Sequence, residues 1–210
     1  MLIFIIMILL SYLAGSIPTA IITGRMLRGI DVREHGSGNA GATNVFRVLG
    51  WKAGLFVLLF DMGKGLLATL LIYRIAVGAL PVDVDVLKIT AGLAAVFGHI
   101  WTVFAGFKGG KGVGTGAGMI IGIVPYAVLF GLVVFILAFG LSRYVSLGSI
   151  LASLSIPLYL LGKYFIFDQP VSTTLLIFSL FIPLLILFTH RSNVGRLLNG
   201  TENKIQFKKS

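Results

Sequence analysis

Three polar segments of this sequence combine glycine with the side chains that proteins use to bind phosphate. The first polar segment, HGSGNAGATNVFR, covers residues 35–47. Its glycines let backbone N–H groups approach an anion, while Ser, Thr and Asn side chains donate hydrogen bonds and an arginine offers a fork for phosphate. The second polar segment, GFKGGKGVGTG over residues 106–116, sets two lysines among glycines. These residue types predict phosphate binding.

The third polar segment is HRSNVGRLLNGTEN, residues 190–203. His190, Asn193 and Arg196 recur every three residues, so a continuous helix would present them on one face. Each segment alone also fits a plain structural role, as a Gly/Asn-rich connection, a positively charged loop or a helix end anchored at lipid headgroups. Three such segments at the same membrane face favour a shared binding site.

The first two polar segments partly match two nucleotide-binding sequence motifs. Residues 36–42 read G-x-G-x-x-G-A, like the dinucleotide fingerprint, but that motif works between a strand and a helix, and no strand–helix–strand pattern surrounds it. The second segment departs from the P-loop, because its spacing is one residue short and Gly112 replaces the Ser or Thr that holds magnesium. We therefore expect neither a dinucleotide site nor an NTPase.

The composition identifies an integral membrane protein. Hydrophobic residues make up 57% of the 210 residues and charged residues only 11%, and the mean hydropathy is +1.02. The net charge of +10 is expected in cytoplasmic loops facing anionic headgroups, and it does not indicate nucleic acid. The absence of cysteine excludes disulfides and thiolate chemistry. We expect one transmembrane domain over residues 1–210.

The elements that must carry these segments are membrane helices. Basic connections over 25–52, around residue 110 and in the C-terminal tail are expected inside, and acidic connections near 81–88 and 163–169 outside. All basic connections fall on the inner side only if residues 113–141 cross the membrane twice, with a turn at Pro125. Each of the two resulting segments is then shorter than a normal span. We therefore predict an all-α fold with seven transmembrane helices, the N-terminus outside and the C-terminus cytoplasmic. The other expected spans are 2–22, 53–80, 88–106, 145–162 and 170–189.

Two polar sites fall inside the expected spans. Asp61 and Lys64 are three residues apart and can form an ion pair that offsets the cost of placing both in a membrane. We expect this pair to be structural rather than catalytic. For His99 we expect a neutral, hydrogen-bonded core histidine.

The three polar segments together resemble the acyl-phosphate-dependent glycerol-3-phosphate acyltransferases, integral membrane enzymes that begin bacterial phospholipid synthesis. The resemblance is carried by residues 36–47, 98–116 and 190–202, with support from DMGKG at 61–65 and RYVSLGS at 143–149. Gly114 stands where this family pattern has alanine, a small residue for a small one. The resemblance implies transfer of a fatty acyl group from acyl phosphate to the sn-1 hydroxyl of glycerol 3-phosphate, which gives lysophosphatidate and phosphate. It also implies seven spans and a site at the cytoplasmic face of the bacterial inner membrane.

Such a reaction needs positioning and charge stabilisation, because acyl phosphate is already activated and no covalent acyl-enzyme is required. We expect the first polar segment to hold the acyl-phosphate headgroup and the two lysines to neutralise glycerol 3-phosphate or the departing phosphate. The proton acceptor is either His190 or a phosphate oxygen of the substrate. The predicted catalytic residues are Arg47, Lys108 and His190, and the predicted substrate-binding residues are Ser37, Gly38, Asn39, Gly41, Thr43, Asn44, Lys111, Ser146, Asn193 and Arg196.

The predicted partners are acyl phosphate, glycerol 3-phosphate and membrane lipids, with no nucleic acid, and the protein is expected to be a monomer. No cluster of Asp, Glu and His suggests a metal, so we expect no cofactor and activity that is insensitive to EDTA. The other large class of glycerolipid acyltransferases uses H-x-x-x-x-D, and none of the three histidines has an aspartate at that spacing. A transporter or channel for a phosphate-bearing anion is the alternative, but it predicts polar motifs at the bilayer midplane in two related halves. A non-catalytic scaffold would leave the Ser, Asn and Thr content of the segments unexplained.

Overall fold

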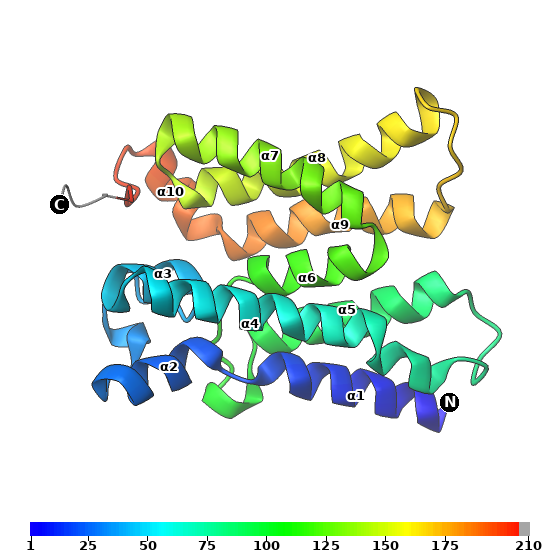
Figure 1. Ribbon diagram of the computed structural model, residues 1–210, viewed down its shortest axis with the longest axis horizontal. Helices are drawn as coiled ribbons and strands as arrows, with labels where there is room; N and C mark the ends of the chain where they lie inside the picture. Colours follow the sequence, from blue (N-terminus) through cyan, green and yellow to red (C-terminus); the bar gives the residue numbers. More distant parts are fainter. Residues whose placement is uncertain (206–210) are drawn as a thin grey trace. The chain divides into compact units, whose positions relative to one another are not determined.

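The computed structural model describes residues 1–205, and every regular element among them is a helix, as predicted. The chain divides into two compact units, Met1–Val124 and Pro125–Ser210 (Figure 1). The first unit contains the first two polar segments, and the second unit contains the third. The single transmembrane domain expected from the sequence stays a prediction.

In the first unit, helices pack in parallel pairs, and shorter helices and loops carry the polar segments. Helix α1 packs against α5, and α4 packs against α6 (Figure 1). Close approach of α4 and α6 depends on glycine, because a Cβ at Gly65 would collide with the Thr115 carbonyl and one at Gly118 with the Met62 carbonyl. The helices are α1 (Leu2–Ser16), α2 (Thr19–Arg28), η1 (Val32–Glu34), α3 (Ala42–Leu49), α4 (Trp51–Leu70), η2 (Ile72–Ala76), α5 (Val84–Ile100), η3 (Val103–Ala105) and α6 (Val113–Ile123).

The first expected span, 2–22, is broken. Helix α1 ends at Ser16 and α2 begins at Thr19, because Pro18 has no N–H for a helical hydrogen bond and its ring disfavours the helical conformation before it. The carbonyl of Ile17, left without a helical partner, accepts a hydrogen bond from Lys64 Nζ of α4 at 2.5 Å. Leu2–Arg28 as a whole is still long and apolar enough to cross a membrane.

The second unit consists of α7 (Pro125–Ser142), α8 (Val145–Phe165), α9 (Thr173–Thr189) and α10 (Arg191–Leu198). Helix α8 packs against both α7 and α9. The turn between α7 and α8 places Arg143 in the left-handed region with φ 63°. The last described residues return to this turn, where the Ile205 N–H donates to the Arg143 carbonyl at 3.1 Å.

The predicted break at Pro125 is confirmed, since α6 ends at Ile123 and α7 begins at Pro125. Only α6, with 11 residues, is short, whereas α7 has 18 residues and can cross a membrane, so the expectation that both pieces are short is wrong for α7. Within residues 1–205 there are five candidate spans, or six if the bent pair α9–α10 is one span. The count of seven and the sides of the termini stay predictions.

Candidate active site

Asn44 organises the first polar segment from a buried position in α3. Its Oδ1 accepts from the Ser37 N–H at 2.7 Å and from Ser37 Oγ at 3.1 Å. Its Nδ2 donates to the carbonyls of Val32 at 2.7 Å and His35 at 3.0 Å. These four bonds use the full capacity of the amide. Asn44 therefore shapes the loop, and its predicted contact with a bound headgroup stays a prediction.

The remaining predicted binding residues of this segment surround the start of α3. Gly36 and Gly38 adopt φ values of 62° and 72°, a left-handed conformation that allows the chain to form a tight loop before the helix. Ser37 is exposed, and Asn39, Gly41, Thr43 and Arg47 are partly buried. Residues 42–49 are helical rather than loop, so Thr43 and Arg47 lie one turn apart on α3. The positive end of the α3 dipole faces the glycine loop, as in anion-binding helix N-termini.

The second polar segment folds back onto the end of α5. The N–H groups of Gly109 and Gly110 donate to the carbonyls of Ile100 at 3.0 Å and His99 at 3.1 Å. Gly106 and Phe107 are both left-handed, with φ values of 65° and 59°. This backbone leaves the Lys108 side chain exposed, while Lys111 is partly buried.

The first and second polar segments lie together in the first unit. Arg33 Nη1, just before the first segment, donates to the carbonyls of Ala105 at 2.9 Å and Lys108 at 3.2 Å. A Cβ at Gly110 would lie 3.0 Å from the Ala40 carbonyl, so the two loops also touch there. The structure thus brings the backbones of the two segments into contact.

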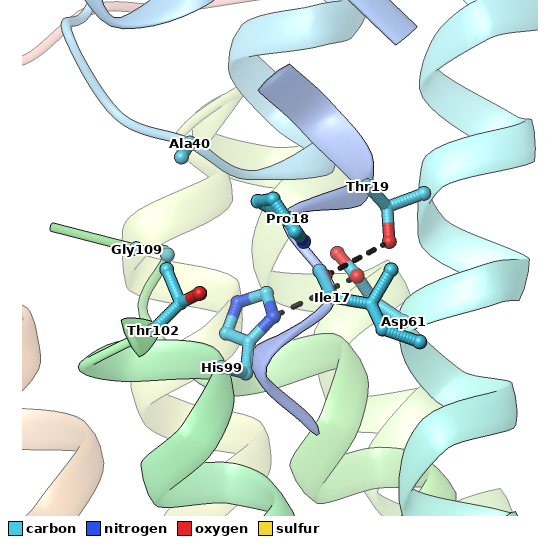
Figure 2. A pocket seen from close by; sticks show the side chains of 9 residues that line it. Ile17, Pro18, Thr19, Ala40, Asp61, His99, Thr102 and Gly109 are labelled. Atoms are coloured by element: carbon cyan, nitrogen blue, oxygen red, sulfur yellow. Dashed lines mark hydrogen bonds and ion pairs between the residues drawn. The ribbon is translucent and has the colours of Figure 1, made fainter. Parts of the chain in front are cut away.

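A buried polar cluster lies beneath the two loops. Lys64 Nζ is 2.6 Å from Asp61 Oδ1, which confirms the predicted ion pair. His99 is buried, and its Nδ1 lies 3.6 Å from the same carboxylate oxygen. Figure 2 shows His99 and Asp61 facing one another in a small pocket that Ala40 and Gly109, one from each loop, also line. The cluster therefore joins the α1–α2 break and α4 to the end of α5.

In the second unit, the third polar segment converges on Glu202. This carboxylate accepts from Ser146 Oγ at 2.9 Å, Asn193 Nδ2 at 2.6 Å and Arg196 Nε at 2.7 Å. Burial raises the pKa of Glu202, but the hydrogen bonds from Asn193, Arg196 and Ser146 outweigh this effect and hold the pKa below its ordinary value. The three donors predicted to bind substrate are thus arranged to hold anionic oxygens.

The helix does not continue straight through His190, so the condition under which His190, Asn193 and Arg196 would share one face is not met. The axes of α9 and α10 differ by 67°, and His190 lies at the bend with a buried side chain. Its Nδ1 is 2.9 Å from the Ile186 carbonyl, so Nδ1 is the protonated nitrogen in a neutral ring and Nε2 is the basic one. Asn193 and Arg196 still share a face of α10, where both reach Glu202.

Sequence reasoning missed Arg33 and Glu202 as site residues. Glu202 lies within the third polar segment and Arg33 just before the first, but Ser146, which Glu202 contacts, and Ala105 and Lys108, which Arg33 contacts, are 56 to 75 residues away in the sequence. Among residues 1–205, no group of three His, Asp or Glu side chains is placed to hold a metal ion.

Known proteins resemble this chain over nearly its whole length. The family model described as glycerol-3-phosphate acyltransferase matches residues 5–200, which include parts of both units. The glycerol-3-phosphate acyltransferases of Chlorobaculum parvum and Chlorobium chlorochromatii are 49% and 45% identical; the alignments cover 99% and 100% of this chain and 98% and 100% of those proteins.

Two crystal structures of the integral membrane glycerol 3-phosphate acyltransferase PlsY share the fold. The glycerol 3-phosphate form is 39% identical with a TM-score of 0.79, and the matched region covers 97% of this chain and 96% of that one. The lysophosphatidic acid form is 38% identical with a TM-score of 0.80, and the matched region covers 97% and 95%. These likenesses confirm the acyltransferase interpretation over a transporter. The chain belongs to the glycerol-3-phosphate acyltransferase family of integral membrane enzymes.

Proposed function

We propose that this enzyme acylates glycerol 3-phosphate at the sn-1 hydroxyl with acyl phosphate as the donor, and releases lysophosphatidate and inorganic phosphate. Acylation of glycerol 3-phosphate is the activity of its family. The observation that best supports this donor is the contact between two glycine-rich, basic loops. Arg33, at the start of the first loop, donates hydrogen bonds to backbone carbonyls of the second, and both loops carry groups suited to phosphate. An acyl-phosphate donor, a mixed anhydride with an anionic phosphate group, fits such a site.

In this proposal the α3 N-terminus, Ser37, Asn39 and Thr43 hold the acyl-phosphate headgroup. The guanidinium of Arg47 lies near the charges of both substrates, and Lys108 and Lys111 neutralise glycerol 3-phosphate and the departing phosphate. Ser146, Asn193 and Arg196, in the second unit, are further proposed substrate-binding residues. Preorganised cations of this kind stabilise charge that develops on the leaving group.

The chemical step is a direct displacement at the acyl carbon. The sn-1 oxygen forms a bond to the carbonyl carbon, the bond from that carbon to the phosphate oxygen breaks, and phosphate leaves with the electron pair. The hydroxyl proton goes to His190 Nε2 or to a phosphate oxygen. His190 is suited to this role because the Ile186 carbonyl fixes the proton on Nδ1. No metal or cofactor takes part.

We further propose seven spans, a single domain, a monomer, and a site at the cytoplasmic face of the bacterial inner membrane, where the basic loops meet anionic headgroups. The first experiment supplies purified enzyme in lipid with glycerol 3-phosphate and either palmitoyl phosphate or palmitoyl-CoA, and follows lysophosphatidate and free phosphate. Turnover with palmitoyl phosphate, unchanged by EDTA, supports the proposal. Turnover only with palmitoyl-CoA would show that the donor is acyl-CoA and not acyl phosphate.

The proton acceptor is tested separately. A His190→Ala variant that keeps most of its kcat, while Arg47→Ala and Lys108→Ala abolish turnover, would assign proton acceptance to the substrate phosphate. Loss of kcat in His190→Ala, with little change in KM for either substrate, supports the histidine.

A further inference from the structure

Asp31 and Arg33 form a fixed pair at the point where the chain enters the first polar segment. Arg33 Nη2 donates to Asp31 Oδ2 at 2.7 Å, and Nε lies 3.1 Å and 3.2 Å from the two carboxylate oxygens. The Arg33 backbone N–H donates to the same carboxylate at 3.0 Å. The guanidinium plane is therefore set by Asp31, and both side chains are partly buried.

The other edge of this guanidinium holds the second polar segment. Nη1 donates to the Ala105 carbonyl at 2.9 Å and to the carbonyl of Lys108 itself at 3.2 Å. The fork thus spans the turn that presents Lys108, and these are contacts between residues 72 and 75 positions apart in the sequence.

The backbone around Lys108 needs such support. Phe107 is a non-glycine residue in the left-handed region at φ 59°, a conformation that persists only where its surroundings impose it. Gly106 precedes this residue, and Gly109 and Gly110 follow Lys108, so the local sequence alone does not fix where the lysine points. The Lys108 side chain is exposed and has no burial to hold it.

We propose that Arg33, oriented by Asp31, is a positioning residue that sets Lys108 in the active site. The inference rests on the proposed function, which assigns Lys108 to phosphate neutralisation. Arg33 acts through the backbone of Lys108 and not as a phosphate ligand, because four of its five N–H donors are used by Asp31 and the two carbonyls. The Asp31 carboxylate also offsets its charge.

Asp31→Asn distinguishes positioning from direct phosphate binding. If Arg33 bound a substrate phosphate, removing the competing carboxylate would leave KM unchanged or lower it. For a positioning residue, the loosened guanidinium lets Lys108 move, and kcat falls. We expect Arg33→Gln and Arg33→Lys to lose about tenfold or more in kcat with KM for glycerol 3-phosphate within about threefold, and Asp31→Asn to move in the same direction. Arg28→Gln, an exposed arginine at the end of α2, is the control with the same charge change.

A direct readout of position uses the absence of cysteine from the sequence. A Lys108→Cys variant carries one nitroxide label, and its electron paramagnetic resonance spectrum reports loop mobility without requiring activity. Label mobility that rises with Arg33→Gln and Asp31→Asn, but not with Arg28→Gln, supports the proposal. Unchanged mobility would overturn it, as would normal kcat in Arg33→Gln. If Arg33→Gln does not fold, as judged by gel filtration, Arg33→Lys and Asp31→Asn decide by the same criteria.

Failure of the proposed function gives a different result. Full turnover by Lys108→Ala would show that Lys108 is not needed, whatever the label reports. A different result would keep the function and refute the positioning role. In that case Lys108→Ala loses turnover, but the label on Lys108→Cys stays as immobile in Arg33→Gln and Asp31→Asn as in the native background.

Discussion

Glu202 holds the third polar segment together, and replacing it tests whether this carboxylate builds the site. Glu202→Gln keeps the size of the side chain but removes the charge that accepts from Ser146, Asn193 and Arg196. The amide must also turn one N–H₂ group toward a cluster of donors. We expect lower thermal stability and loss of acyl transfer, because the donors are no longer held in one place.

The magnitude follows from the three bonds. Each hydrogen bond to a charged group contributes about 1.5–3 kcal/mol, but Gln retains one accepting oxygen and the Arg196 side chain is 37% exposed. We therefore expect a loss of about 2–3 kcal/mol, which corresponds to a Tm lower by roughly 4–12 °C for a chain of this size. Thermal unfolding of the purified enzyme in detergent measures the shift.

The pH dependence of Tm is a second, independent test of the role of the Glu202 carboxylate. The pKa of Glu202 is lower in the folded protein than its ordinary value of 4.5, so the folded state favours the charged carboxylate. Its contribution to stability is present above that ordinary value and is lost as pH falls through the lowered folded pKa. Tm of the native enzyme should therefore fall more steeply on acidification than Tm of Glu202→Gln. Glu34→Gln, at an exposed glutamate, is the matched control. A Glu202→Gln variant with native Tm and native turnover would refute the reasoning.

Three further substitutions test the first unit, each by Tm in detergent and turnover. Asn44→Ala leaves the Ser37 N–H without its acceptor, while the Val32 carbonyl still accepts from the His35 N–H at 3.3 Å, and should cost about 1–3 kcal/mol with reduced activity; native turnover would contradict the loop-shaping role. Lys64→Met strands a buried carboxylate and should cost about 3–5 kcal/mol, whereas adding Asp61→Leu should restore part of the loss; a double variant no more stable than the single one would argue against the ion pair as the cause. Gly65→Val should prevent close packing of α4 and α6, while Gly63→Ala, which meets no atom within 4 Å, should be tolerated; equal yields of the two folded variants would refute that argument.

The elements that the sequence predicted well are those encoded locally. Long apolar stretches marked the membrane helices, and proline marked the boundary between α6 and α7. Pro18 carries the same signal, and it divides the first apolar stretch into α1 and α2. Helix α3 was not predicted, because its eight residues follow a glycine-rich loop and are too few for a clear hydrophobic period. The bend at His190 was missed because the residue spacing alone allows a straight helix.

For the site, residue chemistry identified groups that suit phosphate but not the residues that hold them. Arg33 and Glu202 act over 72 and 56 residues of sequence, and no local pattern specifies such contacts. Asn44 was assigned to the ligand because its amide suits an anion, yet burial has turned all four of its bonds inward.

Arg33, Asn44 and Glu202 differ from ligand-binding residues in one physical respect. Each has most of its hydrogen-bonding capacity used inside the protein, whereas Ser37 and Lys108 are exposed on the loops that those residues shape. Glycine-rich loops can approach an anion closely because they lack side chains, but for the same reason they cannot fix their own conformation. A charged or amide side chain held by several bonds supplies that rigidity from outside the loop. A phosphate site built on glycine therefore needs supporting residues such as Arg33 and Asn44, and substituting these should impair turnover without removing a group that touches the substrate.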